Sequence, residues 1–151
     1  MSSINKYEPQ IQWLGVIPYR EALDLQEQRA NEVRADHSKA TIFGLEHNTV
    51  ITLGIRGREQ EDIFSRMEDL TSEGIEVERV RRGGQATLHS PGQLVIYPIL
   101  PLRHWGLSTR ALMKAMEIAT CRLLKEKGIL SYRGEKEPGV YTSKGKIAFF
   151  G

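Results

Sequence analysis

The residues best suited to chemistry lie in a glycine-rich segment, residues 81–99, which reads RRGGQATLHSPGQLVIYPI. Gly83 and Gly84 follow two arginines, and glycine reaches backbone conformations that bring a ligand close to the main chain. The N–H groups of such a segment can face an anion or a carbonyl oxygen. His89 follows in the same segment, and loops held at strand ends often carry function. A plain turn with a solvated histidine is the alternative, and the spacing matches neither a dinucleotide motif nor a P-loop.

Lys146 is the second candidate, and it lies at the start of a short apolar segment, KIAFFG. A lysine at the start of a buried strand is partly removed from water, which disfavours its ammonium form and makes the amine a better base. Such an amine can take a proton from a thiol or from another amine. The alternative is a strand-end lysine that extends its charge into water.

The elements that must position these residues follow from the apolar pattern. We expect strands over residues 11–17, 40–46, 50–54, 75–80 and 93–100, and a closing hairpin over residues 139–151 that turns near residues 143–145. We expect helices over residues 19–36, 61–70 and 106–128. Residues 81–92 are expected to form a loop, and the continuous apolar run after it is typical of a strand covered on both faces. This mixture predicts an α+β fold with a mixed β-sheet flanked by helices.

The last of these helices has the clearest signals. Ser108 is suited to cap its start and Gly128 to follow its end. The pattern predicts one apolar face formed by Leu112, Met116, Ala119 and Leu123. Cys121 lies about 180° around the helix from that face, and a cysteine on the side of a helix is more often inert than reactive.

Composition narrows the function classes. The chain has 151 residues, enough for one domain, with 40% hydrophobic and 26% charged residues. Its 21 basic and 19 acidic side chains give a formal net charge of only +2, which argues against a dedicated nucleic-acid-binding protein. The first residues have no apolar core of a secretory signal, and no run is long enough to span a membrane. A single cysteine predicts a reducing, cytoplasmic location.

Three segments together resemble one known family. Residues 82–95, RGGQATLHSPGQLV, are similar to the R-G-G-x-x-T-x-H-G-P-G-Q-L-V signature of the octanoyltransferases of lipoate biosynthesis. Residues 46–54 resemble the E-H-x-x-V-x-T-x-G segment of that family, and residues 138–148 resemble its P-G-V-[WY] and K-I-A segments. The resemblance covers nearly all of the chain, in order, and implies a fold like that of the biotin and lipoate protein ligases.

The resemblance also implies an activity and partners. Family members transfer an octanoyl group from octanoyl-acyl carrier protein to a lysine of lipoyl domains, including those of 2-oxo acid dehydrogenase complexes and the glycine cleavage H protein. They do so through a cysteine acyl-enzyme assisted by a lysine, whose place is taken by Lys146. The residues implied to bind the substrate are Arg82, Gly83, Gly84, Gln85, Ala86, Thr87, Leu88 and His89. No cofactor, metal, nucleic acid or membrane partner is implied, and Arg56, Arg58, Arg79, Arg81 and Arg82 would suit an acidic carrier protein or form a solvated face.

Two departures from the family pattern affect this interpretation. Ser90 replaces the glycine of H-G-P-G, and the cysteine-bearing P-C-G element of the family does not occur within the 151 residues. We therefore expect residues 1–151 to form a single octanoyltransferase-like catalytic domain that lacks its C-terminal portion, with the nucleophilic cysteine beyond residue 151. Two alternatives stay open: a non-catalytic module that binds acyl groups or the carrier protein, and an ATP-dependent lipoate or biotin ligase.

Overall fold

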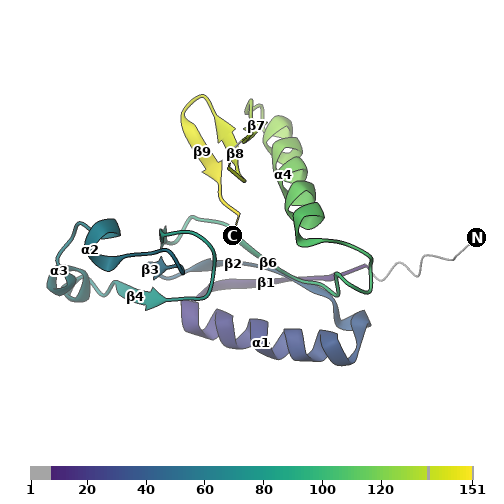
Figure 1. Cartoon of the computed structure of the whole chain (residues 1–151), viewed down its shortest axis with the longest axis horizontal. Coiled ribbons are helices and arrows are strands. Elements are labelled where there is room, and N and C mark those ends of the chain that lie inside the picture. Colours follow the sequence, from purple (N-terminus) through teal and green to yellow (C-terminus); the bar gives the residue numbers. More distant parts are fainter. Residues whose placement is uncertain (1–7, 136, 151) are drawn as a thin grey trace, which may run out of the picture. The chain divides into compact units, whose positions relative to one another are not determined.

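The computed structural model describes residues 8–135 and 137–150. These residues divide into two compact units, one ending at Pro101 and the other beginning at Leu102 (Figure 1). Each unit contains both strands and helices, so the predicted α+β class is confirmed. Among the described residues, no helix is both long and apolar enough to cross a membrane.

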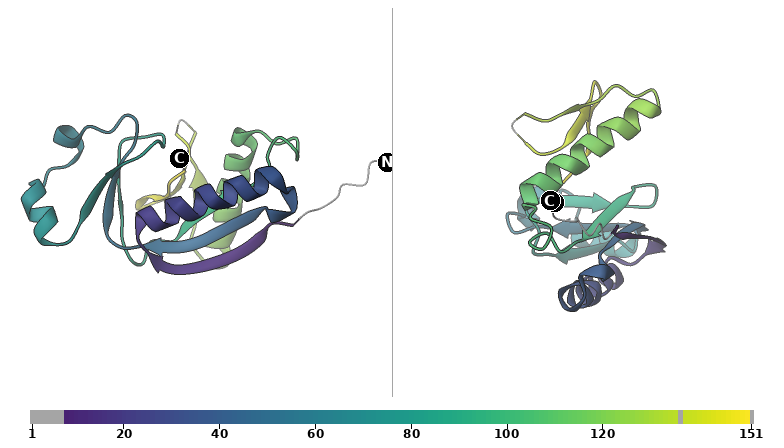
Figure 2. Two further views of the ribbon diagram at one scale, coloured as in Figure 1. Left: turned by 90° about the horizontal axis from the view of Figure 1, so that it is seen from below. Right: turned by 90° about the vertical axis from the view of Figure 1, so that its right-hand side faces the viewer.

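The first unit is built on a three-stranded mixed sheet in the order β1-β2-β6. Strand β1 (Gln10–Ile17) runs parallel to β2 (Thr41–His47), and β6 (Val95–Ile99) runs antiparallel to β2. Helix α1 (Tyr19–Ala35) connects β1 to β2 and lies along one face of the sheet, as Figures 1 and 2 both show. A short 3₁₀ turn, η1 (His37–Lys39), leads from α1 into β2. The core between helix and sheet contains Ala22, Phe43 and Leu45, with Leu14, Ile17, Val95, Tyr97 and Ile99 packed against it.

Strand β6 is less buried than its sequence predicts. Val95, Tyr97 and Ile99 pack toward α1, as the period-two geometry of a strand requires. Ile96 points to the opposite face and is 40% exposed. The prediction that the apolar run is covered on both faces is therefore wrong for this residue.

A second mixed sheet in the same unit carries the glycine-rich segment. Its order is β4-β3-β5, with β3 (Val50–Leu53) parallel to β4 (Glu76–Arg79) and antiparallel to β5 (Ala86–His89). Strand β5 lies within the segment that we expected to be a loop, so that prediction is wrong for residues 86–89. The reason is long-range: the backbone of β5 pairs with β3, which lies more than thirty residues earlier in the chain.

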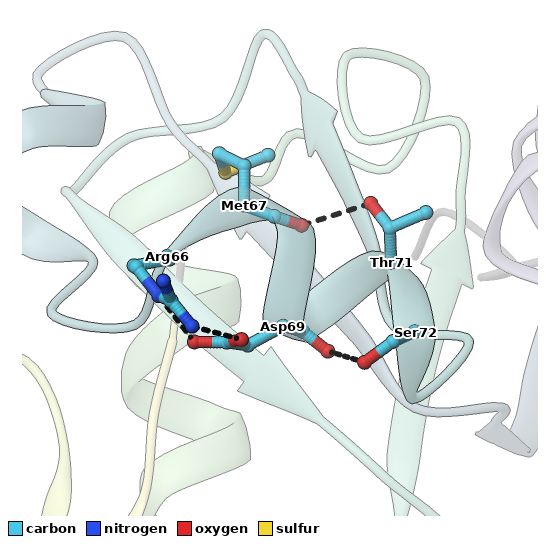
Figure 3. A network of polar contacts seen from close by, with 5 residues as sticks. All are labelled: Arg66, Met67, Asp69, Thr71 and Ser72. Atoms are coloured by element: carbon cyan, nitrogen blue, oxygen red, sulfur yellow. Dashed lines mark hydrogen bonds and ion pairs between the residues drawn. The ribbon is translucent and has the colours of Figure 1, made fainter.

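The single helix predicted over residues 61–70 is instead two short helices, α2 (Glu59–Asp62) and α3 (Met67–Ser72). The chain is extended at Ile63 and restarts as a helix after Arg66. Figure 3 shows why the second helix begins there: the guanidinium of Arg66 pairs with the Asp69 carboxylate, and Thr71 and Ser72 donate to carbonyl oxygens one turn earlier. These local bonds favour a new first turn over continuation of α2.

The second unit contains α4 (Thr109–Glu126) and an antiparallel sheet in the order β7-β8-β9. The strands are β7 (Tyr132–Arg133), β8 (Val140–Thr142) and β9 (Gly145–Ala148), and the predicted hairpin turn between β8 and β9 is confirmed. The predicted caps of α4 are also confirmed. Ser108 accepts a hydrogen bond from the Ala111 N–H at 3.1 Å, and Gly128 follows the helix end with a φ of 75°.

The predicted apolar face of α4 is wrong in part. Leu123 is 50% exposed, whereas Glu117 is buried and Cys121 is half-buried. The helix is thus rotated relative to the face that hydrophobicity alone selects. The partners of Glu117, described below, explain why a carboxylate lies on the buried side.

Candidate functional site

The two arms of the glycine-rich segment are joined to the turn after β3. Three carbonyl oxygens of the glycine-rich segment accept hydrogen bonds from N–H groups of the turn after β3. The Arg82 carbonyl accepts from Ile55 at 3.0 Å, that of Gly84 from Arg56 at 3.2 Å, and that of Gln85 from Gly54 at 2.9 Å. Gly54 permits this approach, because a Cβ atom there would lie 2.5 Å from the Gly84 oxygen. Gly84 itself has a φ of 89°, which disfavours any other residue. The segment is therefore a tightly packed turn held by its carbonyl groups.

The Arg82 side chain stabilises this turn through hydrogen bonds to its backbone and to Thr52. Its guanidinium donates to the Thr52 carbonyl at 2.7 Å and to the Thr52 hydroxyl at 2.8 Å. It also donates to the carbonyl oxygens of Gln85 and Gly83, at 3.1 and 2.9 Å. Partial burial lowers the pKa of Arg82, although the group stays fully protonated at neutral pH. The charge is thus spread over neutral acceptors rather than paired with a carboxylate.

His89 lies at the end of β5 and is oriented by the residue that follows the next turn. Its Nδ1 lies 2.7 Å from the Gln93 side-chain oxygen, and the Gln93 amide nitrogen donates to the Leu88 carbonyl at 3.3 Å. Because that side-chain oxygen can only accept, Nδ1 carries the proton in the neutral ring, and Nε2 faces the Thr52 hydroxyl at 3.5 Å. Burial lowers the pKa of His89. The ring is therefore held in one tautomer.

His47 is fully buried beside His89, at the end of β2. Its Nδ1 lies 3.2 Å from the Ile17 carbonyl, which can only accept, so Nε2 is left to accept from the Tyr97 hydroxyl at 2.9 Å. Burial lowers the pKa of His47. The rings of His47 and His89 meet edge to face at 5.4 Å between centroids, and Tyr19 lies 4.9 Å from the first and 5.8 Å from the second. We call Tyr19, His47, His89 and Tyr97 the aromatic cluster.

The turn after β5 accommodates the serine that departs from the family signature. The Ser90 carbonyl accepts from the Gln93 N–H at 3.1 Å, and Gly92 has a φ of 90°, with Pro91 before it. This is the residue order of a type II turn, which needs glycine at its third position and not at its first. The Glu46 carboxylate accepts from the Gly92 N–H at 2.6 Å and fixes the turn to β2. Ser90 is therefore tolerated, since no non-glycine residue among those described has a positive φ.

Lys146 lies in the second unit, on β9 opposite Tyr141 of β8. Its amine lies 5.5 Å from the ring centroid of Tyr141 and 5.0 Å from that of Phe149, which are cation–π distances. Its side chain passes directly over Gly139: a Cβ atom at Gly139 would overlap the lysine Cε and lie 3.1 Å from Nζ. The lysine is half-buried, as expected for its place at the start of a strand.

Glu117 is the buried charged residue of the same unit. Its carboxylate accepts from the Arg133 Nε at 2.8 Å and from the Gly139 N–H at 2.9 Å. The hydrogen bond from Arg133, and then that from Gly139, hold the pKa of Glu117 below its usual value. Both carboxylate oxygens are thus occupied, which is the condition for burying such a group.

The structure brings several of the sequence candidates together within the first unit. Arg82 and His89 both contact Thr52, and Gly84 packs against Gly54. Gly83 and Gln85 are exposed, and Leu88 is 55% exposed. The contacts of Lys146 given above are all with residues of the second unit. The roles assigned to these residues by resemblance stay predictions. Among the described residues, no group of three or more potential ligands is arranged to hold a metal ion.

Sequence reasoning did not single out several residues that organise these sites: Tyr19, Thr52, Gln93, Tyr97, Glu117 and Gly139. Three of them, Thr52, Gln93 and Gly139, belong to the segments that resemble the family, and those segments were the available signal. Glu117 carried no local signal, because a glutamate on an amphipathic helix is ordinarily solvated. Its partners come from β7 and the residue before β8.

Comparison with known proteins gives a consistent family. A family model described as the lipoyl protein ligase A/B catalytic domain matches residues 18–149. An octanoyltransferase from Caldanaerobacter subterraneus is 37% identical over 138 residues, which is 91% of this chain and 60% of that protein. An octanoyltransferase from Halorhodospira halophila is 42% identical over 120 residues, or 80% of this chain and 52% of that protein. The chain therefore spans between half and two thirds of the length of these relatives.

Solved structures agree on the fold. A bipartite lipoate protein ligase from Thermoplasma acidophilum superposes with a TM-score of 0.63 at 18% identity, covering 93% of this chain and 53% of the ligase chain. A lipoate-protein ligase A bound with ATP gives a TM-score of 0.64 at 16% identity, covering 93% of this chain and 59% of that one. At such identities the likeness establishes a common fold and nothing about the reaction.

Proposed function

Because the chain belongs to the lipoyl protein ligase A/B catalytic domain family, we propose that it is part of an octanoyltransferase that acts in protein lipoylation. The donor would be octanoyl-acyl carrier protein, and the acceptor a specific lysine of a lipoyl domain, as in 2-oxo acid dehydrogenase complexes and the glycine cleavage H protein. Both units would belong to one catalytic domain, since the family model spans both of them. The compartment would be the cytoplasm, in agreement with the single cysteine.

The observation that carries this proposal is the identity of 37% to an octanoyltransferase over 91% of the chain. The ligase alternative rests on weaker ground, because the ligase structures are at most 18% identical and share the fold alone. The preserved residues of the three family segments support the same choice. Arg82, Thr52 and His89 are joined in one network, and Lys146 is held against Gly139.

In the proposed reaction, Lys146 moves protons at two stages. Its amine takes the proton of a cysteine thiol in a segment outside these 151 residues, and the thiolate attacks the thioester carbonyl of the donor. The carbon–sulfur bond to the carrier breaks, and the carrier thiolate takes the proton back from Lys146. The lipoyl-domain amine then attacks the acyl-enzyme, gives its proton to Lys146, and the enzyme thiolate leaves and recovers that proton.

Residues 82–89, the glycine-rich turn together with strand β5, would bind the acyl group in this scheme. The exposed Gly83, which has open space around its Cα, gives the thioester access to the main chain, and Leu88 offers apolar surface. Burying hydrocarbon contributes about 0.8 kcal/mol per CH₂, which is an adequate source of affinity for an eight-carbon chain. Arginines near this turn, including Arg56 and Arg81, would attract an acidic carrier protein.

Replacing Lys146 with alanine tests the proposal in the full-length protein encoded by the gene. We expect Lys146→Ala to lower octanoyl transfer from octanoyl-acyl carrier protein to an apo-lipoyl domain by about 100-fold or more, the usual contribution of a general acid–base. The readout is the intact mass of the lipoyl domain over time. Lys144→Ala is the matched control, because Lys144 is an exposed lysine of the same hairpin, and it should transfer at the wild-type rate.

Undiminished transfer by Lys146→Ala would remove this lysine from the mechanism. Modification of the lipoyl domain from free octanoate and ATP, without the carrier protein, would show that the protein is a ligase and not a transferase. Tight binding of octanoyl-acyl carrier protein without any transfer by the wild-type protein would favour a non-catalytic binding module.

A further inference from the structure

A buried carboxylate in the second unit, that of Glu117, is linked to Lys146 through one intervening residue, Gly139. Glu117 is 5% exposed and is the one buried carboxylate among the described residues. It comes from α4, whereas its partners come from β7 and the residue before β8, so it joins the helix to two separate parts of the sheet. Isolated burial of an ionised carboxylate is costly, and here two charge-assisted bonds of normal length offset that cost.

Gly139 is the link between this carboxylate and the lysine. Its N–H donates to Glu117 at 2.9 Å, and its carbonyl accepts from the Gly134 N–H at 2.9 Å. The glycine is therefore fixed on both sides. The Lys146 side chain lies against its Cα so closely that no side chain fits between them. The position of Gly139 consequently defines one wall of the space that the lysine occupies.

An irregularity in the hairpin adds to this constraint. Val140 pairs with Ala148 and Tyr141 with Lys146, so Ile147 is an extra residue on β9. Such a bulge redirects the neighbouring side chains and increases the local twist. The lysine amine is thereby directed between the rings of Tyr141 and Phe149, with Gly139 beneath its aliphatic chain.

We propose that Glu117 is a positioning residue for Lys146: by binding Gly139 and Arg133 together, its carboxylate fixes the wall against which the reactive amine lies. The inference rests on the catalytic role proposed above for Lys146 and adds a residue on a different element, without contact between Glu117 and the reacting atoms. Displacement of a catalytic group by about 1 Å can lower the rate of the reaction by about 100-fold.

The test compares Glu117→Gln with wild type in the full-length protein. The glutamine amide would turn an N–H toward the Arg133 N–H, so one of the two bonds must break. We expect kcat for octanoyl transfer to fall by about 10- to 100-fold, with little change in KM for the lipoyl domain. Glu126→Gln is the matched control: it makes the same change at the exposed end of α4 and should leave kcat unaltered.

A second readout follows the lysine itself and does not depend on turnover. In protein labelled with ¹³C at lysine Cε, the Lys146 resonance is assigned by its loss in Lys146→Arg. We expect its chemical shift to change in Glu117→Gln, because the amine moves relative to the rings of Tyr141 and Phe149, and to stay unchanged in Glu126→Gln. A merely structural role would lower the melting temperature without moving this resonance in the folded protein.

Wild-type kcat together with an unmoved Lys146 resonance in Glu117→Gln would overturn the proposal. If that variant does not fold, Glu117→Asp decides in its place, because the shortened carboxylate cannot hold both partners at once. Wild-type behaviour of a folded Glu117→Asp would overturn it equally. Full transfer by Lys146→Ala would instead refute the proposed function, while the resonance would still report whether Glu117 positions the lysine.

Discussion

At the scale of single residues, the adjacent glycines of the 82–95 segment have different roles. Gly84 has a φ of 89°, and a Cβ atom there would lie 3.3 Å from the Arg82 guanidinium. Gly83 has no positive φ, and a Cβ atom there would meet no atom within 4 Å. Gly84 is therefore required for its backbone conformation. Gly83 instead leaves open space at an exposed position, where the resemblance predicts that substrate binds.

Alanine at each of these positions separates the two roles. We expect Gly84→Ala to lower the free energy of unfolding by about 1–2 kcal/mol, because alanine is strained in the left-handed region. Gly83→Ala should change it by less than about 0.5 kcal/mol, as for most exposed substitutions. Urea unfolding of the two variants measures both values. Equal losses would show that the strain at Gly84 is not what requires glycine there.

At the scale of elements, the aromatic cluster joins four of them. Tyr19 begins α1, His47 ends β2, His89 ends β5 and Tyr97 lies in β6. The two histidines are oriented by groups that accept from Nδ1, the Ile17 carbonyl and the Gln93 side chain. Burial lowers the pKa of His89, and the charges of His47 and Arg82 act in the same direction. The cluster therefore links both sheets of the first unit through neutral imidazoles.

This burial makes stability depend on pH in a defined direction. Burial lowers the pKa of His47 in the folded protein below its ordinary value of 6.5, so below pH 6.5 the unfolded chain binds more protons. Stability is therefore complete above pH 6.5 and is lost as the pH falls toward the folded-state pKa. The loss approaches about 1.4 kcal/mol per pH unit for one histidine.

His47→Gln should remove this histidine's share of the slope. Urea unfolding between pH 5 and pH 8 gives the free energy of unfolding of wild type and variant as a function of pH. The slopes of the two profiles are compared, because a loss of stability that is the same at every pH does not change the slope. His89→Gln should act in the same direction, since burial also lowers the pKa of His89. Parallel profiles of wild type and His47→Gln would contradict the assignment.

At the scale of the whole molecule, the proposed function needs a thiol, and we expect it to come from a cysteine other than Cys121. Cys121 is half-buried on α4, beside Ile118 and Arg122 in a shallow groove that also includes Leu130. It lies on a different element from Lys146, and no family segment contains it. The curated relatives are longer than this chain, which covers 60% of one and 52% of another.

Cys121→Ser in the full-length protein tests this division. We expect the variant to form the acyl-enzyme from octanoyl-acyl carrier protein at the wild-type rate, because another cysteine is the proposed nucleophile. Intact-mass measurement in the absence of a lipoyl domain detects the acyl-enzyme directly. Loss of the acyl-enzyme in Cys121→Ser would make Cys121 the nucleophile and would overturn the proposed placement of the thiol.

The sequence by itself determined most elements and the family. Local signals were sufficient where a residue acts on its own backbone or on a nearby neighbour: Ser108 and Gly128 at the ends of α4, and Pro91-Gly92 in the turn after β5. The family segments identified Lys146 and residues 82–89 as candidates for the same reason, since each lies in a contiguous pattern.

Only the tertiary structure decided which distant groups satisfy one another. Strand β5 exists because β3 supplies its hydrogen bonds, and Arg82 is held by Thr52, thirty residues earlier in the chain. Glu117 is buried because Arg133 and Gly139 occupy both of its oxygens, a pairing that reverses the ordinary preference of glutamate for water. Hydrogen bonds between elements depend on distance in space rather than in sequence, and helical periodicity therefore could not identify the buried face of α4.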